Sequence, residues 1–231
     1  SEAGMVKLNE SVIRVKGRLG PGQMLALDLA EGKFYGNDEI MADLSAQEDY
    51  GAWVKQITVI DDLSGSDGSN IAHLKNIELI KASILDEAAL ARAAKGAEYV
   101  FHLAAMVSVP ASVERPRLYH DVNTTGTVNV LSAARDAKAK RMMFSASSSA
   151  YGDSPELPKV EPMTPMPKSP YAATKLAGEH YVRAYANSYE SDAVSLRYFN
   201  IFGPRQNANS AYAGVIAAFA RMLLGGKNPT I

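Results

Sequence analysis

From Ile57 onward, short apolar runs alternate with stretches of helical periodicity, and this pattern limits the fold more than any other feature of the sequence. Strands are predicted at residues 57–60, 77–80, 99–103, 141–145 and 194–198. Helices are predicted at residues 86–95, 128–137, 171–189 and 211–224. Strands that alternate with helices form a parallel sheet, so we expect an α/β fold with a doubly wound parallel sheet. In such sheets ligands bind beyond the carboxyl ends of the strands.

Charge and composition exclude several functional classes. The net charge of −1 gives no bulk attraction to nucleic acid or anionic lipid. The sequence has no cysteine, which excludes disulfides, thiolate metal sites and a cysteine nucleophile. No apolar run reaches the roughly 20 residues that span a bilayer, and the first residues do not resemble a signal peptide. We therefore expect a cytoplasmic protein that binds no nucleic acid and no membrane.

Tyr171 and Lys175 are four residues apart in a predicted helix, which puts both on one face. A free tyrosine is a poor base at neutral pH, with a pKa near 10, but a nearby cation favours the phenolate. Such a pair can take a proton from an alcohol while hydride leaves the carbon. The alternative is a core tyrosine and a solvated lysine on an ordinary helix, and the spacing alone does not exclude it.

Two further positions support a site of this kind. Ser147 lies in the serine-rich run that follows a predicted strand, where a hydroxyl can hydrogen-bond a substrate oxygen as charge develops on it. Asp61 ends the strand at 57–60, where a carboxylate can accept hydrogen bonds from ribose hydroxyls and would repel a 2′-phosphate, favouring NAD over NADP. Both residues could also be simple turn residues. His102 lies in a buried-strand pattern and is predicted to be a core residue, and the other histidines show no metal-ligand spacing, so no metal is expected.

Six motifs occur in order from Ile57 to the last residue: VIDDLS (59–64), VFHLAA (100–105), NTTGT (123–127), the run 144–152, SPYAATK (169–175) and LRYFNIFGPRQ (196–206). With these motifs the chain resembles the extended short-chain dehydrogenases, and within them the NAD-dependent epimerase/dehydratase family of the UDP-glucose 4-epimerase type. The resemblance implies a Rossmann-like fold. It also implies a nucleotide-sugar 4-epimerase that binds NAD and a UDP-sugar and acts through a transient 4-keto intermediate.

The resemblance also implies roles for individual residues. The catalytic residues would be Tyr171, Lys175 and Ser147. The cofactor would contact Tyr171 and Lys175 together with Asp61, Asp62, Leu103, Ala104, Ala105, Asn123 and Phe199. The substrate would contact Ser148, Ser149 and Asn200. Dehydratases of the family carry Thr-Asp-Glu where this chain has Ser147-Ser148-Ser149, which favours epimerisation over dehydration.

The sequence departs from the family at both ends. Members open with a strand and a TGxxGxxG turn whose backbone N–H groups receive the pyrophosphate, whereas the nearest glycines here, in residues 17–22, have the wrong spacing and include Pro21. Residues 1–56 instead resemble the end of the amidotransferase domain of the glutamate synthase large subunit. We therefore expect a glutamate-synthase-like segment at 1–56 and an incomplete NAD-binding epimerase domain at 57–231, ending before the substrate domain.

These departures leave alternatives open. The chain could be an inactive fragment or fusion remnant of the family, or another extended short-chain dehydrogenase such as a nucleotide-sugar dehydratase. Apolar runs at 24–29 or 12–15 could fill the position of the missing first strand. A further helix is predicted after Asn37. A homodimer through the helices at 128–137 and 171–189 is also expected, provided that the core is intact.

Overall fold

The computed structural model describes residues 26–28, 33–35, 38, 39, 42, 56–201, 219, 222–226 and 228. The chain divides into two compact units, one of residues 1–53 with 203–206, the other of residues 54–202 with 207–231. The first unit contains a two-stranded antiparallel sheet of β1 (Ala26–Asp28) and β2 (Lys33–Tyr35), with Leu27 opposite Phe34. Three described residues of the helix predicted after Asn37, at 38, 39 and 42, are helical.

The hypothesis that residues 24–29 fill the missing strand position is wrong. The described part of that run is β1, which pairs with β2 in a sheet of its own. β2 follows β1 after a short loop, so pairing the two strands costs little loop-closure entropy. Pairing β1 with β3 would close a loop of about thirty residues, which costs more. The second candidate, residues 12–15, lies outside the described residues.

The described residues of the second unit form five strands, which pair in parallel in two groups. β3 (Ile57–Asp61) pairs along its whole length with β4 (Ile77–Lys81), from Ile57 opposite Ile77 to Asp61 opposite Lys81. β5 (Tyr99–His102), β6 (Arg141–Ser147) and β7 (Ala193–Tyr198) form a three-stranded sheet in the order β5-β6-β7. All five strands were predicted from apolar runs, and their parallel pairing confirms the expected α/β class.

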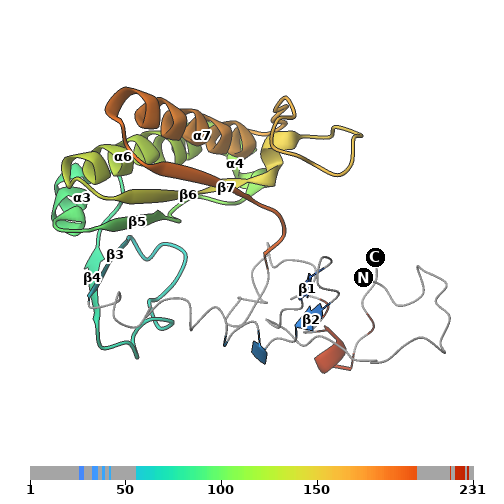
Figure 1. Cartoon of the computed structure of the whole chain (residues 1–231), viewed down its shortest axis with the longest axis horizontal. Coiled ribbons are helices and arrows are strands. Elements are labelled where there is room, and N and C mark those ends of the chain that lie inside the picture. Colours follow the sequence, from blue (N-terminus) through green and yellow to red (C-terminus); the bar gives the residue numbers. More distant parts are fainter. Residues whose placement is uncertain are drawn as a thin grey trace. The chain divides into compact units, whose positions relative to one another are not determined.

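Three helices of eight residues or more accompany these strands in the described part of the chain. α3 (Glu87–Ala94) begins after Asp86, whose side chain accepts a hydrogen bond from Ala89 N. α6 (Gly126–Asp136) and the long α7 (Pro170–Tyr189) cover the three-stranded sheet on one side (Figure 1). All three helices were predicted, with bounds that differ by a few residues. No helix in the described part of the chain is long and apolar enough to cross a membrane.

Four short helical segments complete the described unit: α4 (Val109–Glu114), α5 (Pro116–His120), the π-helical η2 (Asp121–Thr125) and the 3-10 helix η3 (Ser148–Tyr151). The sequence pattern did not predict them, because each is too short to show a helical period and two carry proline in the first turn. η3 directly follows the end of β6 and contains Ser148 and Ser149, and η2 contains Asn123, so both segments hold residues of the predicted site.

The hydrophobic core lies between the three-stranded sheet and its helices. Phe144 of β6 is 1% exposed and packs in the same cluster as Leu131 of α6 and Val182 of α7. Gly178 of α7 makes this packing possible, because a Cβ there would lie 2.5 Å from Phe144 Cζ. The absence of a side chain at Gly178 therefore sets how closely α7 approaches the sheet.

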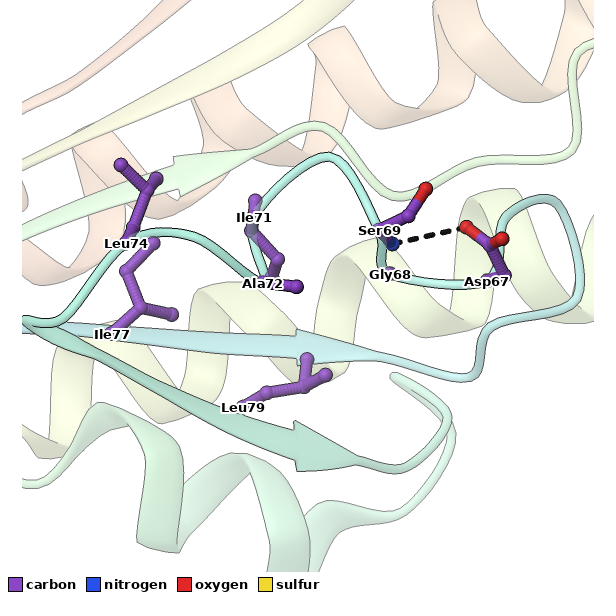
Figure 2. Close-up of a pocket in the computed structure, with 8 residues that line it drawn as sticks. All are labelled: Asp67, Gly68, Ser69, Ile71, Ala72, Leu74, Ile77 and Leu79. Atoms are coloured by element: carbon purple, nitrogen blue, oxygen red, sulfur yellow. Dashed lines mark hydrogen bonds between the residues drawn. The ribbon is translucent and has the colours of Figure 1, made fainter.

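A separate cleft of about 310 Å³ lies where the loop after β3 folds over β4 (Figure 2). Apolar side chains of the loop and of β4 line most of it, and Asp67 Oδ1 closes a turn by accepting a hydrogen bond from Ser69 N at 3.0 Å. The lining residues are Asp67, Gly68, Ser69, Ile71, Ala72, Leu74, Ile77 and Leu79. None of them is a predicted site residue, so this cleft is distinct from the site described next.

Candidate functional site

Tyr171 and Lys175 lie on the first two turns of α7. The helix begins at Pro170 because Ser169 caps it, its Oγ accepting a hydrogen bond from Ala172 N at 3.1 Å. Tyr171 is half-buried and Lys175 is only 4% exposed. Burial of this lysine excludes the solvated lysine that the sequence left open, because an ordinary surface lysine keeps its ammonium in water.

The Lys175 ammonium lies against an aromatic ring. Its Nζ is 4.5 Å from the centre of the Phe144 ring, and no described residue accepts a hydrogen bond from it. Burial lowers the pKa of Lys175 to about 8, and the negative charge of Glu179 opposes part of that shift. The site thus contains a buried cation whose three N–H donors are available to a ligand.

His102 lies beneath the same ring and is not part of the reactive group. It is 3% exposed, its Nε2 is 2.9 Å from Thr127 Oγ1, and its ring centre is 5.4 Å from that of Phe144. Burial, and secondarily the charge of Lys175, lowers the pKa of His102 to about 3. It is therefore neutral at pH 7, and its burial confirms the interpretation of His102 as a core residue.

The serine cluster lies at the carboxyl end of β6. Ser147 ends the strand and caps η3, with its Oγ accepting hydrogen bonds from Ser149 N at 3.2 Å and from Ser149 Oγ at 2.8 Å. Ser148 and Ser149 form the first turn of η3, and η3 packs against α7. The fold therefore brings the serines and the helix of Tyr171 and Lys175 to the same end of the sheet (Figure 1).

Asn123 joins the segment after β5 to α7. Its Oδ1 accepts a hydrogen bond from Met106 N at 2.8 Å, and its Nδ2 donates to Met106 O at 3.0 Å and to Thr174 Oγ1 at 3.1 Å. Thr174 Oγ1 in turn donates to the backbone oxygen of Tyr171 at 2.8 Å. Because Asn123 is 1% exposed, its side chain acts as a clamp between these two segments.

The segment held by that clamp contains three predicted cofactor contacts. Leu103 is 64% exposed, directly after the end of β5. Ala104 packs against the core, and Ala105 is half-buried. The three residues follow directly on the end of β5, where a ligand of a parallel sheet is expected.

Asp61 is the last residue of β3, and Asp62 follows it directly. Asp61 Oδ1 accepts a hydrogen bond from Leu63 N at 2.6 Å, and Asp62 Oδ1 accepts one from Ser64 N at 2.8 Å. The hydrogen bonds from Ser64 lower the pKa of Asp62. Within the described residues no hydrogen bond or ring contact joins these two carboxylates to the group around Lys175.

The remaining predicted residues follow β7. Phe199 is 60% exposed, with its ring centre 6.1 Å from that of Tyr151, and Asn200 is exposed beside it. The sequence argument missed a pair that lies between this strand and α7, Arg197 and Glu179, whose side chains are joined at 2.8 Å. A charged residue inside an apolar strand, and an acid one helical turn beyond Lys175, are the signals that point to them.

Parallel strands with a buried lysine one turn after a tyrosine, and with serines at the neighbouring strand end, define a Rossmann-like protein of the short-chain dehydrogenase class. The chain belongs to the NAD dependent epimerase/dehydratase family, which it matches over residues 45–231. Residues 1–53 match a second family, the class-II glutamine amidotransferases. Both matches agree with the resemblances found in the sequence.

Individual relatives support the assignment. The chain is similar to UDP-glucose 4-epimerase of Mycolicibacterium smegmatis, 39% identical over 177 residues that cover 74% of this chain and 56% of the relative. It is similar in structure to UDP-N-acetylglucosamine 4-epimerase of Methanobrevibacter ruminantium, solved with UDP-N-acetylmuramic acid, with a TM-score of 0.72, 41% identity, and coverage of 76% of this chain and 57% of that one. UDP-glucose 4-epimerase of Thermus thermophilus, solved with NAD, matches with a TM-score of 0.70, 37% identity, and coverage of 80% and 60%. The chain thus spans somewhat more than half the length of these relatives.

Proposed function

We propose that residues 57–231 carry the acid–base part of an NAD-dependent nucleotide-sugar 4-epimerase of the UDP-glucose/UDP-galactose type. The observation that supports this most directly is the Lys175 ammonium, which is buried, lies one helical turn after Tyr171 and has no hydrogen-bond acceptor among the described residues. A buried cation in this state is stabilised when a ligand hydroxyl or a phenolate accepts its hydrogen bonds. The proposed reaction supplies both kinds of acceptor.

The residue types present suit the two riboses of NAD, each in its own strand group. Lys175 and Tyr171 would hold the nicotinamide ribose, and Asp61, whose Oδ2 has no partner among the described residues, would accept from the adenosine ribose. The other proposed contacts are Asp62, Leu103, Ala104, Ala105 and Phe199, with Asn123 holding the 104–106 segment in position. When bound, NAD supplies an acceptor and then a donor of hydride at C4 of the sugar.

The chain's own residues would manage the proton and the charge. Tyr171 Oη takes the proton of the sugar 4-hydroxyl as hydride leaves C4, which gives a 4-keto sugar, and returns the proton when hydride comes back to the opposite face of C4. Lys175 would stabilise the Tyr171 phenolate, which is the form that takes this proton and is formed again when the proton returns to the sugar. Ser147 Oγ already accepts two hydrogen bonds from Ser149, so its own proton is available to the sugar oxygen.

The substrate would be a UDP-sugar, held in part by Ser148, Ser149 and Asn200. Epimerisation is favoured over 4,6-dehydration because the serines of η3 offer hydroxyls where dehydration needs acid–base carboxylates. A nucleotide-sugar dehydratase is therefore the weaker enzymatic alternative. The cytoplasmic location, the absence of nucleic-acid and membrane partners, and the homodimer through α6 and α7 stay predictions.

A second candidate is an inactive fragment or fusion remnant in which an amidotransferase-like segment, residues 1–56, precedes the epimerase residues. One observation favours it: no described strand pairs with the second edge of β3 or of β5. The two strand groups that would hold the two riboses of NAD are therefore not joined into one sheet within the described residues. A site divided in this way would bind NAD weakly even with Tyr171 and Lys175 in position.

Two measurements on the full chain test the proposal. NAD at millimolar concentration should raise the melting temperature, because a ligand that binds only the native state stabilises it. The chain with NAD should convert UDP-galactose to UDP-glucose, and Tyr171→Phe should reduce kcat by a factor of roughly 100 or more. Tyr181→Phe, on the exposed side of the same helix, is the matched control and should retain activity. No melting shift together with no turnover would reject the enzyme in favour of the remnant.

A further inference from the structure

An ion pair between β7 and α7 lies close to the candidate site but belongs to none of its predicted roles. Arg197 Nε donates to Glu179 Oε1 at 2.9 Å and to Oε2 at 3.1 Å, and Nη2 donates to Oε2 at 2.8 Å. The two side chains are 15% and 12% exposed. This two-pronged geometry fixes both groups more firmly than a surface ion pair does.

Arg197 also contacts a third segment. Its guanidinium carbon is 4.7 Å from the centre of the Tyr151 ring in η3, and Tyr151 stacks with Phe199. Tyr151 is 4% exposed, so this contact is inside the protein. One guanidinium thus touches α7, which carries Tyr171 and Lys175, and η3, which follows Ser147, while its own strand leads to Phe199 and Asn200.

Stability alone does not account for this arrangement. Arg197 Nη1 is buried and has no hydrogen-bond partner among the described residues. Buried ion pairs frequently contribute no more stability than apolar side chains of the same size, and an unmatched buried N–H adds a further cost. A role in positioning explains why a charged pair occupies this point.

The ion pair is also linked to Lys175 by charge. Glu179 is four residues after Lys175, on the same face of α7, and it raises the pKa of Lys175 against the effect of burial. The other titratable groups beside Lys175 are Tyr171 on α7 and His102 on β5, which is neutral at pH 7. The charges therefore follow in the order positive, negative, positive from Lys175 through Glu179 to Arg197.

We propose that Arg197 is a positioning residue of the site, which orients Glu179 toward Lys175 and fixes the serine segment through Tyr151. This inference rests on the proposed epimerase function. Arg197 neutralises part of the charge of Glu179, so the acid keeps the lysine protonated without capturing its ammonium in an ion pair. The lysine then stays available to the ribose and the tyrosine.

The test is a titration of Lys175 in the full chain. The rate at which Lys175 is acetylated in competition with a reference amine is measured at each pH by mass spectrometry of its peptide. The experiment needs neither NAD nor activity. Glu179→Gln leaves Arg197 unpaired and should lower the Lys175 pKa by about 1 unit, whereas Arg197→Met leaves Glu179 unpaired and should raise it by a similar amount. The double variant should titrate near the wild type. Shifts in the same direction, or no shift in either single variant, would overturn the proposal.

Controls separate positioning from misfolding and from failure of the proposed function. Asp192→Asn breaks the exposed ion pair between Asp192, just before β7, and Arg141 of β6, and should leave the Lys175 titration unchanged. Arg197→Lys keeps the charge but loses the two-pronged geometry, so it should keep the Lys175 pKa within about 0.3 unit of the wild type and, if the chain is active, reduce kcat several-fold with little change in KM. Should Arg197→Met not fold, as judged by circular dichroism, Glu179→Gln and Arg197→Lys carry the test. The titration does not depend on turnover. An inactive wild type would therefore reject the proposed epimerase activity, whereas the charge link from Arg197 to Lys175 is decided separately by whether the two single variants shift the Lys175 pKa in opposite directions.

Discussion

The two faces of the sheet β5-β6-β7 use the same strands in opposite ways. The row formed by His102, Phe144 and Ser195 faces the helices, and its first two residues are 3% and 1% exposed. The adjacent row contains Phe101 and Val194, which are 66% and 39% exposed. Neighbouring aromatic side chains in paired strands thus have opposite environments, because successive residues of a strand point to opposite faces.

The two faces differ in what covers them within the described residues. On the helix-covered face, α6 and α7 pack against the strands and the candidate site forms above Phe144. On the open face, the described residues include exposed apolar side chains such as Phe101 and Val194, and no described helix covers that face (Figure 1). Apolar residues on both faces predict a sheet covered on both sides. In the described part of the chain, only one of the two covering layers is present, the one formed by α6 and α7.

The largest effect should come from removing the ring at the centre of the covered face. Phe144→Ala should lower the free energy of unfolding by about 3–5 kcal/mol, because it leaves a cavity under α7 and removes the ring beneath Lys175. Urea unfolding at pH 7 measures the loss. A change below 1 kcal/mol would show that the two faces do not differ as their exposure indicates.

Much of this organisation could be predicted from the sequence, for a physical reason. Strands and long helices were found because burial imposes a period of two or of about 3.6 on apolar residues. The candidate site was predicted from Tyr171, Lys175 and the serines only together with the other family motifs, since the four-residue spacing of the tyrosine and the lysine also fits an ordinary helix. The run at 24–29 was misassigned because its apolar residues carry no information on which strand they pair with.

What the sequence could not supply is the pairing of side chains across elements. That Asn123 clamps Met106 and Thr174, and that Arg197 joins Glu179 to Tyr151, depends on the three-dimensional crossing of α7 over the sheet. The burial of Lys175 depends on the same crossing, because four-residue spacing fixes the face of a helix but not which face is covered. The burial set by this crossing is what lowers the pKa of Lys175.

The second largest effect concerns the cost of that buried charge. Lys175 has a folded pKa of about 8 against an ordinary value of 10.5, so the native state binds fewer protons than the unfolded state between these values, and stability should rise with pH across that window. Below pH 8 the full cost is present, and Lys175→Met should stabilise the chain at pH 7 by up to about 3 kcal/mol. Urea unfolding from pH 7 to 10 checks this. A variant less stable than the wild type at pH 7 would mean that the contact with Phe144 outweighs desolvation.

A smaller effect is expected where α7 touches the sheet. Gly178→Ala introduces a Cβ at 2.5 Å from Phe144 Cζ and 2.9 Å from Phe144 Cε1, so the ring or the helix must shift, at a cost of about 1–3 kcal/mol. The double variant Gly178→Ala/Phe144→Leu should recover part of that loss, since the smaller side chain relieves the contact. Thermal melts of the two single variants and the double variant measure the coupling, and strict additivity would argue against this contact as the cause.

The smallest effect should come from the open face. Phe101→Thr keeps a residue that favours strands and should change the free energy of unfolding by less than about 1 kcal/mol, because the Phe101 ring is two-thirds exposed. It should also reduce self-association at high protein concentration, measured by light scattering, since an exposed aromatic on an apolar sheet face promotes contact between molecules. Phe144 and Phe101 thus form a matched pair of rings on adjacent strands. A loss for Phe101→Thr as large as that for Phe144→Ala would mean that both faces of this sheet are covered in solution.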